Sequence, residues 1–238
     1  MKAILLAAGK GSRISKNIPN IPKSALDVAG IPLIVRTIEM LIKHNIEITI
    51  VVGYQHKVIE NLIQKGNYHV NIVYNPFFDV TNSIGSLWMA KDFIVEDDFI
   101  IANADVFWEE QILNQIIQEK DPVFMLSDRT RAEDGDYFFL VQEGRIVKYG
   151  KELDKEQRNC EYVGIAFIKK SFIKKFKNRL LEMVERQEHN CWWENVLYSF
   201  TDEQPIYSID VDGKFWAEVD FIEDYERILD YAKERLMV

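Results

Sequence analysis

Near its amino end the chain reads LLAAGKGSR over residues 5–13 and PK at residues 22–23. The aliphatic run at residues 3–6 predicts a buried strand that leads into this loop. Because the loop's glycines lack side chains, its backbone can bend sharply and bring N–H groups close to an anion. The arginine and lysine that end the two segments would add positive charge there. The combination predicts a polyphosphate-binding loop, and the alternative is an ordinary strand-to-loop turn.

Two other phosphate motifs do not fit this loop. The dinucleotide fingerprint needs a third glycine where this chain has Ile14. Lys10 is not placed as in the P-loop motif Gly-x-x-x-x-Gly-Lys. The loop therefore belongs to another class of phosphate site.

Composition excludes several classes of protein. The chain has 238 residues and a net charge of −9, which argues against a general nucleic-acid binder. Cys160 and Cys191 lie far apart without Cys-x-x-Cys spacing, so zinc and disulfide chemistry lack support. No window approaches ~20 uninterrupted apolar residues and no cleavable leader is recognisable. We expect a soluble, cytoplasmic protein that binds neither nucleic acid nor membrane.

Apolar runs and segments of helical period alternate along the chain. Predicted strands occupy residues 3–6, 46–52, 70–74, 99–102, 123–126, 162–168, 206–211 and 215–219. Predicted helices occupy residues 31–45, around 58–63, 83–90 with Ser83 as the N-cap, 109–120, 172–188, 191–200 and 222–236. Such apolar strands predict an α/β fold, in which helices cover both faces of a mixed, mostly parallel sheet.

One segment departs from this alternation. Residues 137–142 and 145–149 flank Glu143-Gly144 and predict a small antiparallel insertion that shapes the site for a second substrate. We expect a single domain over residues 1–238, with its nucleotide-binding half at about 1–128 and its acceptor-binding half at about 129–238.

Two aspartates follow predicted strands. Asp105 comes after the strand at 99–102, at the carboxyl end where open α/β sheets bind ligands. Asp220 comes directly after the strand at 215–219. A loop aspartate is more often solvated or capping than functional, so neither position is decisive by itself.

Together these residues resemble the nucleotidyltransferases that activate sugar-1-phosphates and small phospho-alcohols, and the resemblance covers nearly the whole chain. The signature loop is matched by Leu6, Ala7, Ala8, Gly9, Lys10, Gly11, Ser12 and Arg13, with Pro22 and Lys23. Asp105 and Asp220 fall at the family's two metal aspartates. The resemblance implies the family's Rossmann-like three-layer fold. Tyr74-Asn75 and the run from Asn82 to Leu87 are similar to bacterial phosphocholine and phosphonate cytidylyltransferases.

The resemblance implies an Mg²⁺-dependent enzyme that joins CTP to a small phosphorylated or phosphonate amino-alcohol and releases pyrophosphate. Asp105 and Asp220 would hold Mg²⁺, while Arg13 and Lys23 would contact the phosphates. The expected nucleotide-binding residues are Leu6, Ala7, Ala8, Gly9, Gly11, Ser12, Asn82 and Ser83.

The acceptor is less closely defined by the resemblance. Lys151 would orient the acceptor's phosphate, and a cationic headgroup would be held by carboxylates and aromatic faces. The candidates are Asp136, Glu194, Tyr137, Trp192, Trp193, Phe215 and Trp216. Phosphocholine enzymes surround the trimethylammonium with aromatic rings, but residues 129–139 contain no tryptophan. Phosphocholine, phosphoethanolamine, aminoethylphosphonate and hydroxyethylphosphonate all stay open.

Two other functions also stay open. A sugar-1-phosphate nucleotidyltransferase would use UTP, dTTP or GTP instead of CTP. A non-catalytic nucleotide-binding subunit could keep the same fold, although it would need no metal pair. A homodimer is compatible with either reading.

Overall fold

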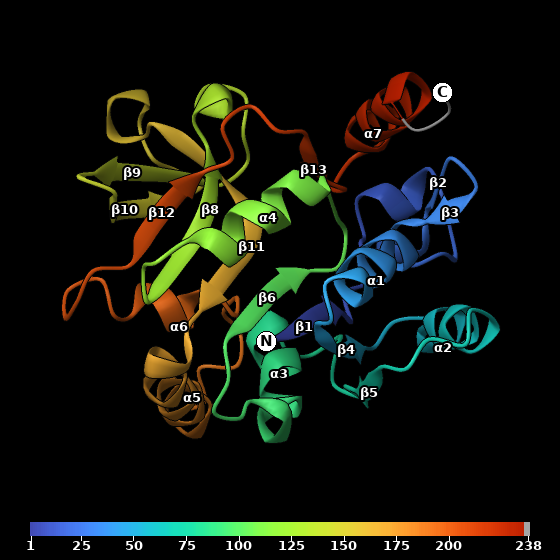
Figure 1. Ribbon diagram of the computed structural model, residues 1–238, viewed down its shortest axis with the longest axis horizontal. Helices are drawn as coiled ribbons and strands as arrows, with labels where there is room; N and C mark the ends of the chain where they lie inside the picture. Colours follow the sequence, from blue (N-terminus) through green and yellow to red (C-terminus); the bar gives the residue numbers. More distant parts are fainter. Residues whose placement is uncertain (236–238) are drawn as a thin grey trace.

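The computed structural model describes residues 1–235, and a single large sheet forms its centre. The strands of this sheet are β1 (Lys2–Ala7), β4 (Glu47–Val52), β5 (Asn71–Tyr74), β6 (Phe99–Asn103), β8 (Val123–Asp128), β9 (Phe138–Gln142), β10 (Arg145–Gly150), β11 (Cys160–Ile168) and β12 (Tyr207–Asp210). They lie in the order β5-β4-β1-β6-β11-β8-β12-β10-β9 (Figure 1).

Strand direction changes across this sheet. β5, β4, β1 and β6 run parallel to one another. β11 is antiparallel to both β6 and β8, and β10 pairs antiparallel with β9 as the predicted hairpin. The prediction of a mixed sheet is confirmed, and its continuous parallel part consists of the four strands nearest the amino end. The carboxyl ends of these four strands therefore meet at one edge.

Helices cover both faces of the sheet, which gives three layers. They are α1 (Leu33–Lys43), α2 (His56–Lys65) and α4 (Glu110–Gln118) on one face, and α3 (Ser83–Met89), α5 (Lys170–Glu185) and α6 (Asn195–Tyr198) on the other. Because successive side chains of a strand point to opposite faces, Leu5 of β1 packs into the first layer whereas Ile4 and Leu6 pack into the second. No helix within residues 1–235 is long and apolar enough to cross a lipid bilayer.

A smaller apolar cluster lies beside the main sheet. Its elements are β2 (Asp27–Val28), β3 (Ile31–Pro32), β7 (Val106–Trp108), β13 (Trp216–Glu218) and α7 (Ile222–Arg235). β7 and β13 pair antiparallel, and Phe107, Ala217 and Ile228 are buried together between them and α7. This pairing brings two segments more than a hundred residues apart in the sequence to the same edge as the parallel strands.

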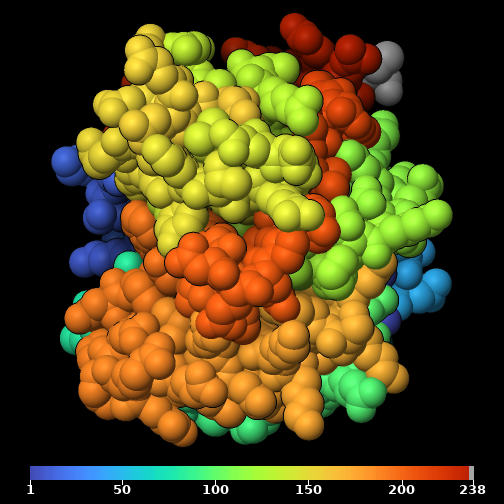
Figure 2. Space-filling model, turned by 90° about the vertical axis from the view of Figure 1, so that its left-hand side faces the viewer, coloured from blue at the N-terminus to red at the C-terminus, as the bar shows by residue number. Residues whose placement is uncertain are grey.

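The hairpin end of the molecule faces the viewer in Figure 2. The yellow residues of the hairpin region lie above the orange residues of α5 and α6, and the segment that leads into β12 lies between them. Segments from the second half of the chain therefore form a continuous wall at this end.

The expected helices and strands are present, mostly with small differences at their ends, but the helix expected over residues 191–200 is only the four-residue α6. The helix predicted over residues 31–45 begins at Leu33, because Ile31 and Pro32 form β3 instead. The prediction of Ser83 as N-cap is wrong: the side chain of Asn82 caps α3 by accepting from the Ser83 amide at 2.7 Å. The last helix was expected to reach Leu236, which lies outside the described residues.

The loop after β1 rests on the turn after β4. The Tyr54 amide donates to the carbonyl oxygen of Ala8 at 3.0 Å. Gly53 lies so close that an added Cβ would be 2.7 Å from the Ala8 oxygen and 2.7 Å from Cβ of Phe78. Ala8 and Phe78 both line the cavity described below. Because Gly53 has no side chain, these two residues can pack in the positions that line it.

We expect Gly53→Ala to lower the free energy of unfolding by about 1–3 kcal/mol, because the new methyl group must displace the backbone of the loop. Urea denaturation measures this change. Gly9→Ala is the matched control, since a Cβ there would meet nothing within 4 Å and Gly9 does not have a positive φ. The control should change stability by less than about 1 kcal/mol. Equal stability of the two variants would contradict the close packing at Gly53.

Candidate active site

The edge where the parallel strands end opens into a cavity of about 470 Å³. It is lined by the loop after β1, the start of α3, the ends of β6 and β13, and residues next to the β9–β10 hairpin and α6. The predicted residues found in its lining are Leu6, Ala7, Ala8, Gly9, Gly11, Ser12, Arg13, Lys23, Asn82, Ser83, Asp105, Asp136, Tyr137, Lys151, Glu194 and Asp220. The fold thus brings the predicted nucleotide and acceptor residues to one cavity.

Three predicted acceptor residues, Phe215, Trp193 and Trp216, do not line the cavity. Trp193 is fully buried, and its indole N–H donates to the Asn103 side-chain oxygen at 3.0 Å. Trp216 is also buried, and its indole N–H donates to Asp128 at 2.8 Å. The prediction that Trp193 and Trp216 contact the acceptor is therefore wrong, because the core holds both rings. Adjacent residues point in different directions, and it is Trp192 that lines the cavity.

The anion-binding loop packs directly against Lys23. Gly11 has a φ of +60°, and a Cβ at this position would lie 2.6 Å from Cγ of Lys23. Only glycine adopts this conformation readily and also leaves room for the lysine stem. Lys23 itself begins a single turn of 3₁₀ helix after Pro22. The contact between Gly11 and the Lys23 side chain therefore joins the glycine loop to the Pro22-Lys23 segment.

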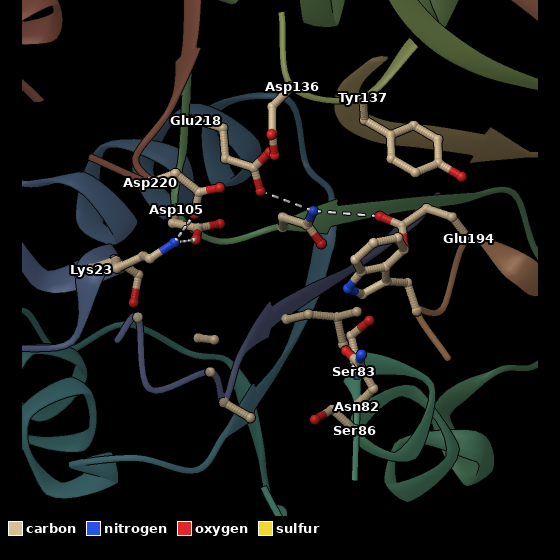
Figure 3. Close-up of a pocket in the computed structure, with 18 of the residues that line it drawn as sticks. Lys23, Asn82, Ser83, Ser86, Asp105, Asp136, Tyr137, Glu194, Glu218 and Asp220 are labelled. Carbon is tan, nitrogen blue, oxygen red and sulfur yellow. Dashed lines mark hydrogen bonds and ion pairs between the residues drawn. The ribbon is translucent and has the colours of Figure 1, made fainter. Parts of the chain in front are cut away.

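Lys23 lies between two carboxylates (Figure 3). Its ammonium is 3.3 Å from Asp105 Oδ2 and donates to Asp220 Oδ1. The Arg13 guanidinium donates to the other oxygen of Asp220 at 2.7 Å. The fold thus joins all four residues predicted to act on the phosphates into one charged cluster, which we call the Lys23 cluster.

The pKa values in the Lys23 cluster follow from burial and charge together. Burial alone would lower the pKa of Lys23, but the charges of Asp105 and Asp220 raise it above its usual value. Burial would raise the pKa of Asp220, but Lys23 and Arg13 hold it below its usual range. Burial raises the pKa of Asp105 in spite of Lys23, and the charge of Asp220 adds to this.

The carboxylate pair has the chemistry of a magnesium site. Asp105 and Asp220 offer hard oxygen ligands that already converge on a single cation, the ammonium of Lys23. Among residues 1–235 no group of three or more His, Cys, Asp and Glu side chains is arranged to hold a metal. Mg²⁺ commonly keeps one or two carboxylates and completes its shell with water and phosphate oxygens, so two aspartates are a fitting set.

At the other end of the cavity lies a wall of aromatic rings. Tyr137 and Trp192 are in edge contact, with ring centres 5.6 Å apart. Tyr162 and Tyr198 line the same region. Lys151 pairs with Asp136, and its ammonium lies 5.5 Å from the centre of the Trp192 ring. Lys151 therefore lies between the Lys23 cluster and the aromatic wall, where a phosphate joined to a small organic headgroup would need a cation.

Two carboxyl groups, the buried one of Glu194 and the partly buried one of Glu218, share one amide. The Asn103 side-chain amide donates to Glu194 at 3.4 Å and to Glu218 at 3.3 Å, as the dashed lines in Figure 3 show. Burial raises the pKa of Glu194 to about 7, although the Asn103 hydrogen bond acts in the opposite direction. Burial raises the pKa of Glu218 well above its usual value, and the charges of Asp105 and Asp220 add to the effect.

Hydrogen bonds join the start of α3 to the segment that precedes α6. The Asn82 amide at the start of α3 donates to the carbonyl oxygen of His189 at 2.9 Å. The Ser83 hydroxyl accepts from the Trp193 amide at 2.9 Å. Glu194 directly follows Trp193 in the chain. Its position therefore depends on the hydrogen bond between Trp193 and Ser83 at the start of α3.

Sequence reasoning missed several residues of the lining. They are Ser24, Phe78, Thr81, Ser86, Asn103, Tyr162, Tyr198 and Glu218. Glu218 had a usable signal, since it lies two residues before Asp220 and alternate residues of a strand share a face. Tyr198 had none, because its position depends on how α6 packs.

A model of the family described as MobA-like NTP transferase domain matches residues 3–189. The choline-phosphate cytidylyltransferase of Haemophilus influenzae is 27% identical, over 96% of this chain and 96% of that protein. The CTP:phosphoglutamine cytidylyltransferase of Campylobacter jejuni is 25% identical, over 95% of this chain and 98% of that protein.

Solved structures share the fold. The CTP:phosphocholine cytidylyltransferase of Streptococcus pneumoniae superposes with a TM-score of 0.79 at 22% identity, over 97% of this chain and 98% of that one. The inositol-1-phosphate CTP transferase of T. maritima gives a TM-score of 0.79 at 22% identity, over 98% of this chain and 96% of that one. The Rossmann-like α/β architecture of nucleotidyltransferases is therefore confirmed.

We expect Glu194→Gln to change how stability depends on pH. An unfolded glutamate ionises near its ordinary pKa of 4.5, whereas burial raises the pKa of Glu194 to about 7 in the folded protein. Between these values the folded state binds the extra proton, so the glutamate costs the wild type stability as the pH rises. From pH 5 to pH 8 the variant should gain about 2–3 kcal/mol in unfolding free energy relative to the wild type. Urea denaturation at both pH values measures this, and a constant difference would contradict the assignment.

Proposed function

The chain belongs to the family of MobA-like NTP transferase domains, and we propose that it is an Mg²⁺-dependent cytidylyltransferase that joins CTP to a small phosphorylated or phosphonate amino-alcohol. One observation carries this proposal: a single cavity combines the glycine loop, the Lys23 cluster and an aromatic wall with a buried carboxylate. The choice of CTP is supported by relatives of nearly equal length that are named cytidylyltransferases.

The reaction exchanges one phosphoanhydride bond for another. A phosphate or phosphonate oxygen of the acceptor attacks the α-phosphorus of CTP, and the bond from that phosphorus to the bridging oxygen breaks. The electron pair leaves with pyrophosphate, and the product is CDP-linked when the acceptor is a phosphate and CMP-linked when it is a phosphonate. No general base is needed, because the second pKa of a phosphomonoester is about 6 and the nucleophile is already largely ionised. The chain's task is to bring two anions together in line.

The Lys23 cluster supplies the positive charge for this task. Arg13 and the amides of the glycine loop would bind the β- and γ-phosphates, and Lys23 would stabilise charge at the α-phosphoryl group. The base would lie against residues 7–9 and near Asn82. When bound by Asp105 and Asp220, Mg²⁺ would neutralise further phosphate charge.

The aromatic wall would receive the other substrate. Lys151 would orient the acceptor's phosphate, because it lies between the Lys23 cluster and the rings of Tyr137 and Trp192. Those ring faces attract a cationic headgroup, and Glu194 supplies a nearby negative charge. Asp136 would hold Lys151 in place until the phosphate binds.

Pyrophosphate release tests the proposal directly. The assay combines Mg²⁺, each of the four nucleoside triphosphates and a panel of phosphocholine, phosphoethanolamine, aminoethylphosphonate, hydroxyethylphosphonate and hexose-1-phosphates. We expect release with CTP and a small amino-alcohol acceptor. Release only with a hexose-1-phosphate and another nucleotide would contradict the proposal and move the protein to the sugar branch. Nucleotide binding without release from any acceptor would favour a binding-only role.

We expect Asp105→Ala and Asp220→Ala each to reduce turnover at least about 100-fold, because each removes half of the carboxylate pair. Asp230→Ala is the matched control, since its side chain on α7 is 71% exposed and lies outside the cavity lining. Circular dichroism should show that all three variants are folded. Folded Asp105 or Asp220 variants with full turnover would contradict the metal assignment.

A further inference from the structure

At the far end of the cavity the buried carboxyl group of Glu194 has no cationic partner within residues 1–235. Glu194 and Glu218 accept from the two hydrogens of one amide, that of Asn103. Among residues 1–235 no lysine, arginine or histidine lies within ion-pair distance of either carboxylate, in contrast to Asp105 and Asp220. A cation beside Glu194 would stabilise its ionised form, so this end is complementary to a cation.

Two tyrosine hydroxyls at the same end have no partner with hydrogen-bond geometry within residues 1–235, although that of Tyr198 lies near Tyr137. They belong to Tyr162 and Tyr198, whose exposed fractions are only 7% and 3%. Both residues line the cavity, as does Glu194. The hydroxyl of Tyr162 lies beside the Glu194 carboxylate, whose charge contributes to the raised pKa of that tyrosine after burial itself. A buried hydroxyl without a partner is unfavourable, so these atoms favour a ligand that can hydrogen-bond to them.

The rings around these hydroxyls do not by themselves select one kind of cation. Tyr137 lies parallel to Tyr198 with centres 5.9 Å apart and in edge contact with Trp192. Ring faces attract a trimethylammonium and a primary ammonium alike. The selection must therefore come from the polar atoms.

On the basis of the proposed function, we propose that the acceptor's headgroup carries a primary ammonium, and that Glu194, Tyr162 and Tyr198 select it over a trimethylammonium. A primary ammonium has three N–H donors, which match one carboxylate oxygen and two hydroxyl oxygens. A trimethylammonium has none and would leave both hydroxyls unpaired. A site built from buried polar groups rejects an analogue that lacks their partners. A neutral hydroxyl headgroup would leave the carboxylates without a positive charge.

Three acceptors separate these effects, because they share one phosphate and one two-carbon chain. They are phosphoethanolamine, phosphocholine and 2-hydroxyethyl phosphate. With CTP and Mg²⁺ we expect kcat/KM for phosphoethanolamine to exceed that for each of the others at least about 100-fold. The selectivity is the kcat/KM for phosphoethanolamine divided by the kcat/KM for phosphocholine. It should fall by about tenfold in each of three variants, Tyr162→Phe, Tyr198→Phe and Glu194→Gln.

Tyr149→Phe is the matched control. Tyr149 stacks on Tyr198 with ring centres 4.1 Å apart but does not line the cavity, so its variant should keep the wild-type ratio. If one tyrosine variant does not fold, the inference is still tested by the kcat/KM ratio of the wild type and by the Glu194→Gln variant.

The outcomes distinguish this inference from the proposed function. Equal or better use of phosphocholine would overturn the inference and leave a cytidylyltransferase standing. Equal use of 2-hydroxyethyl phosphate would overturn it too, since charge would then not matter. Turnover of hexose-1-phosphates alone, or of no acceptor in the panel, would overturn the proposed function and the inference together.

Discussion

The contact of one ammonium with two aspartates determines how the site is assembled. Lys23 meets Asp105 and Asp220, and the second of these pairs spans 197 residues of sequence. Two carboxylates this close repel one another unless a cation lies between them. The pairing of β7 with β13 brings them together, and the Val219 amide donates to the Asp105 carbonyl oxygen at 3.0 Å. The small apolar cluster under α7 therefore supports the chemistry as well as the fold.

The two ends of the cavity differ in charge. This difference would orient the two substrates relative to each other without a conformational change. At one end Arg13 and Lys23 would serve a polyphosphate, and at the other Glu194 has no cationic partner within residues 1–235. An acceptor with a phosphate at one end and an amine at the other fits such a field in only one direction. Its phosphate is then directed toward the nucleotide, which is the alignment that an in-line attack requires.

The sequence predicted what local rules control. The apolar runs fixed the strands, and the glycines near Arg13 marked the loop, because backbone freedom and strand burial can be seen residue by residue. Side-chain direction in irregular segments could not be predicted. Nothing local distinguishes Trp192 from Trp193, and only the core decides which ring is buried. The role of Asn103 was equally hidden, since an amide shared by two distant carboxylates exists only once β6, β13 and α6 are packed.

The acceptor end of the cavity also contains buried groups that lower the stability of the folded state. Glu194 has its pKa raised to about 7 by burial, and the hydroxyls of Tyr162 and Tyr198 have no partner with hydrogen-bond geometry within residues 1–235. Each of these features is unfavourable for folding by itself, and such local inconsistencies are expected at functional sites. The two large apolar clusters on either side of the sheet offset them. Because a ligand that binds only the folded state stabilises it, a cation that pairs with these groups would return part of that stability on binding.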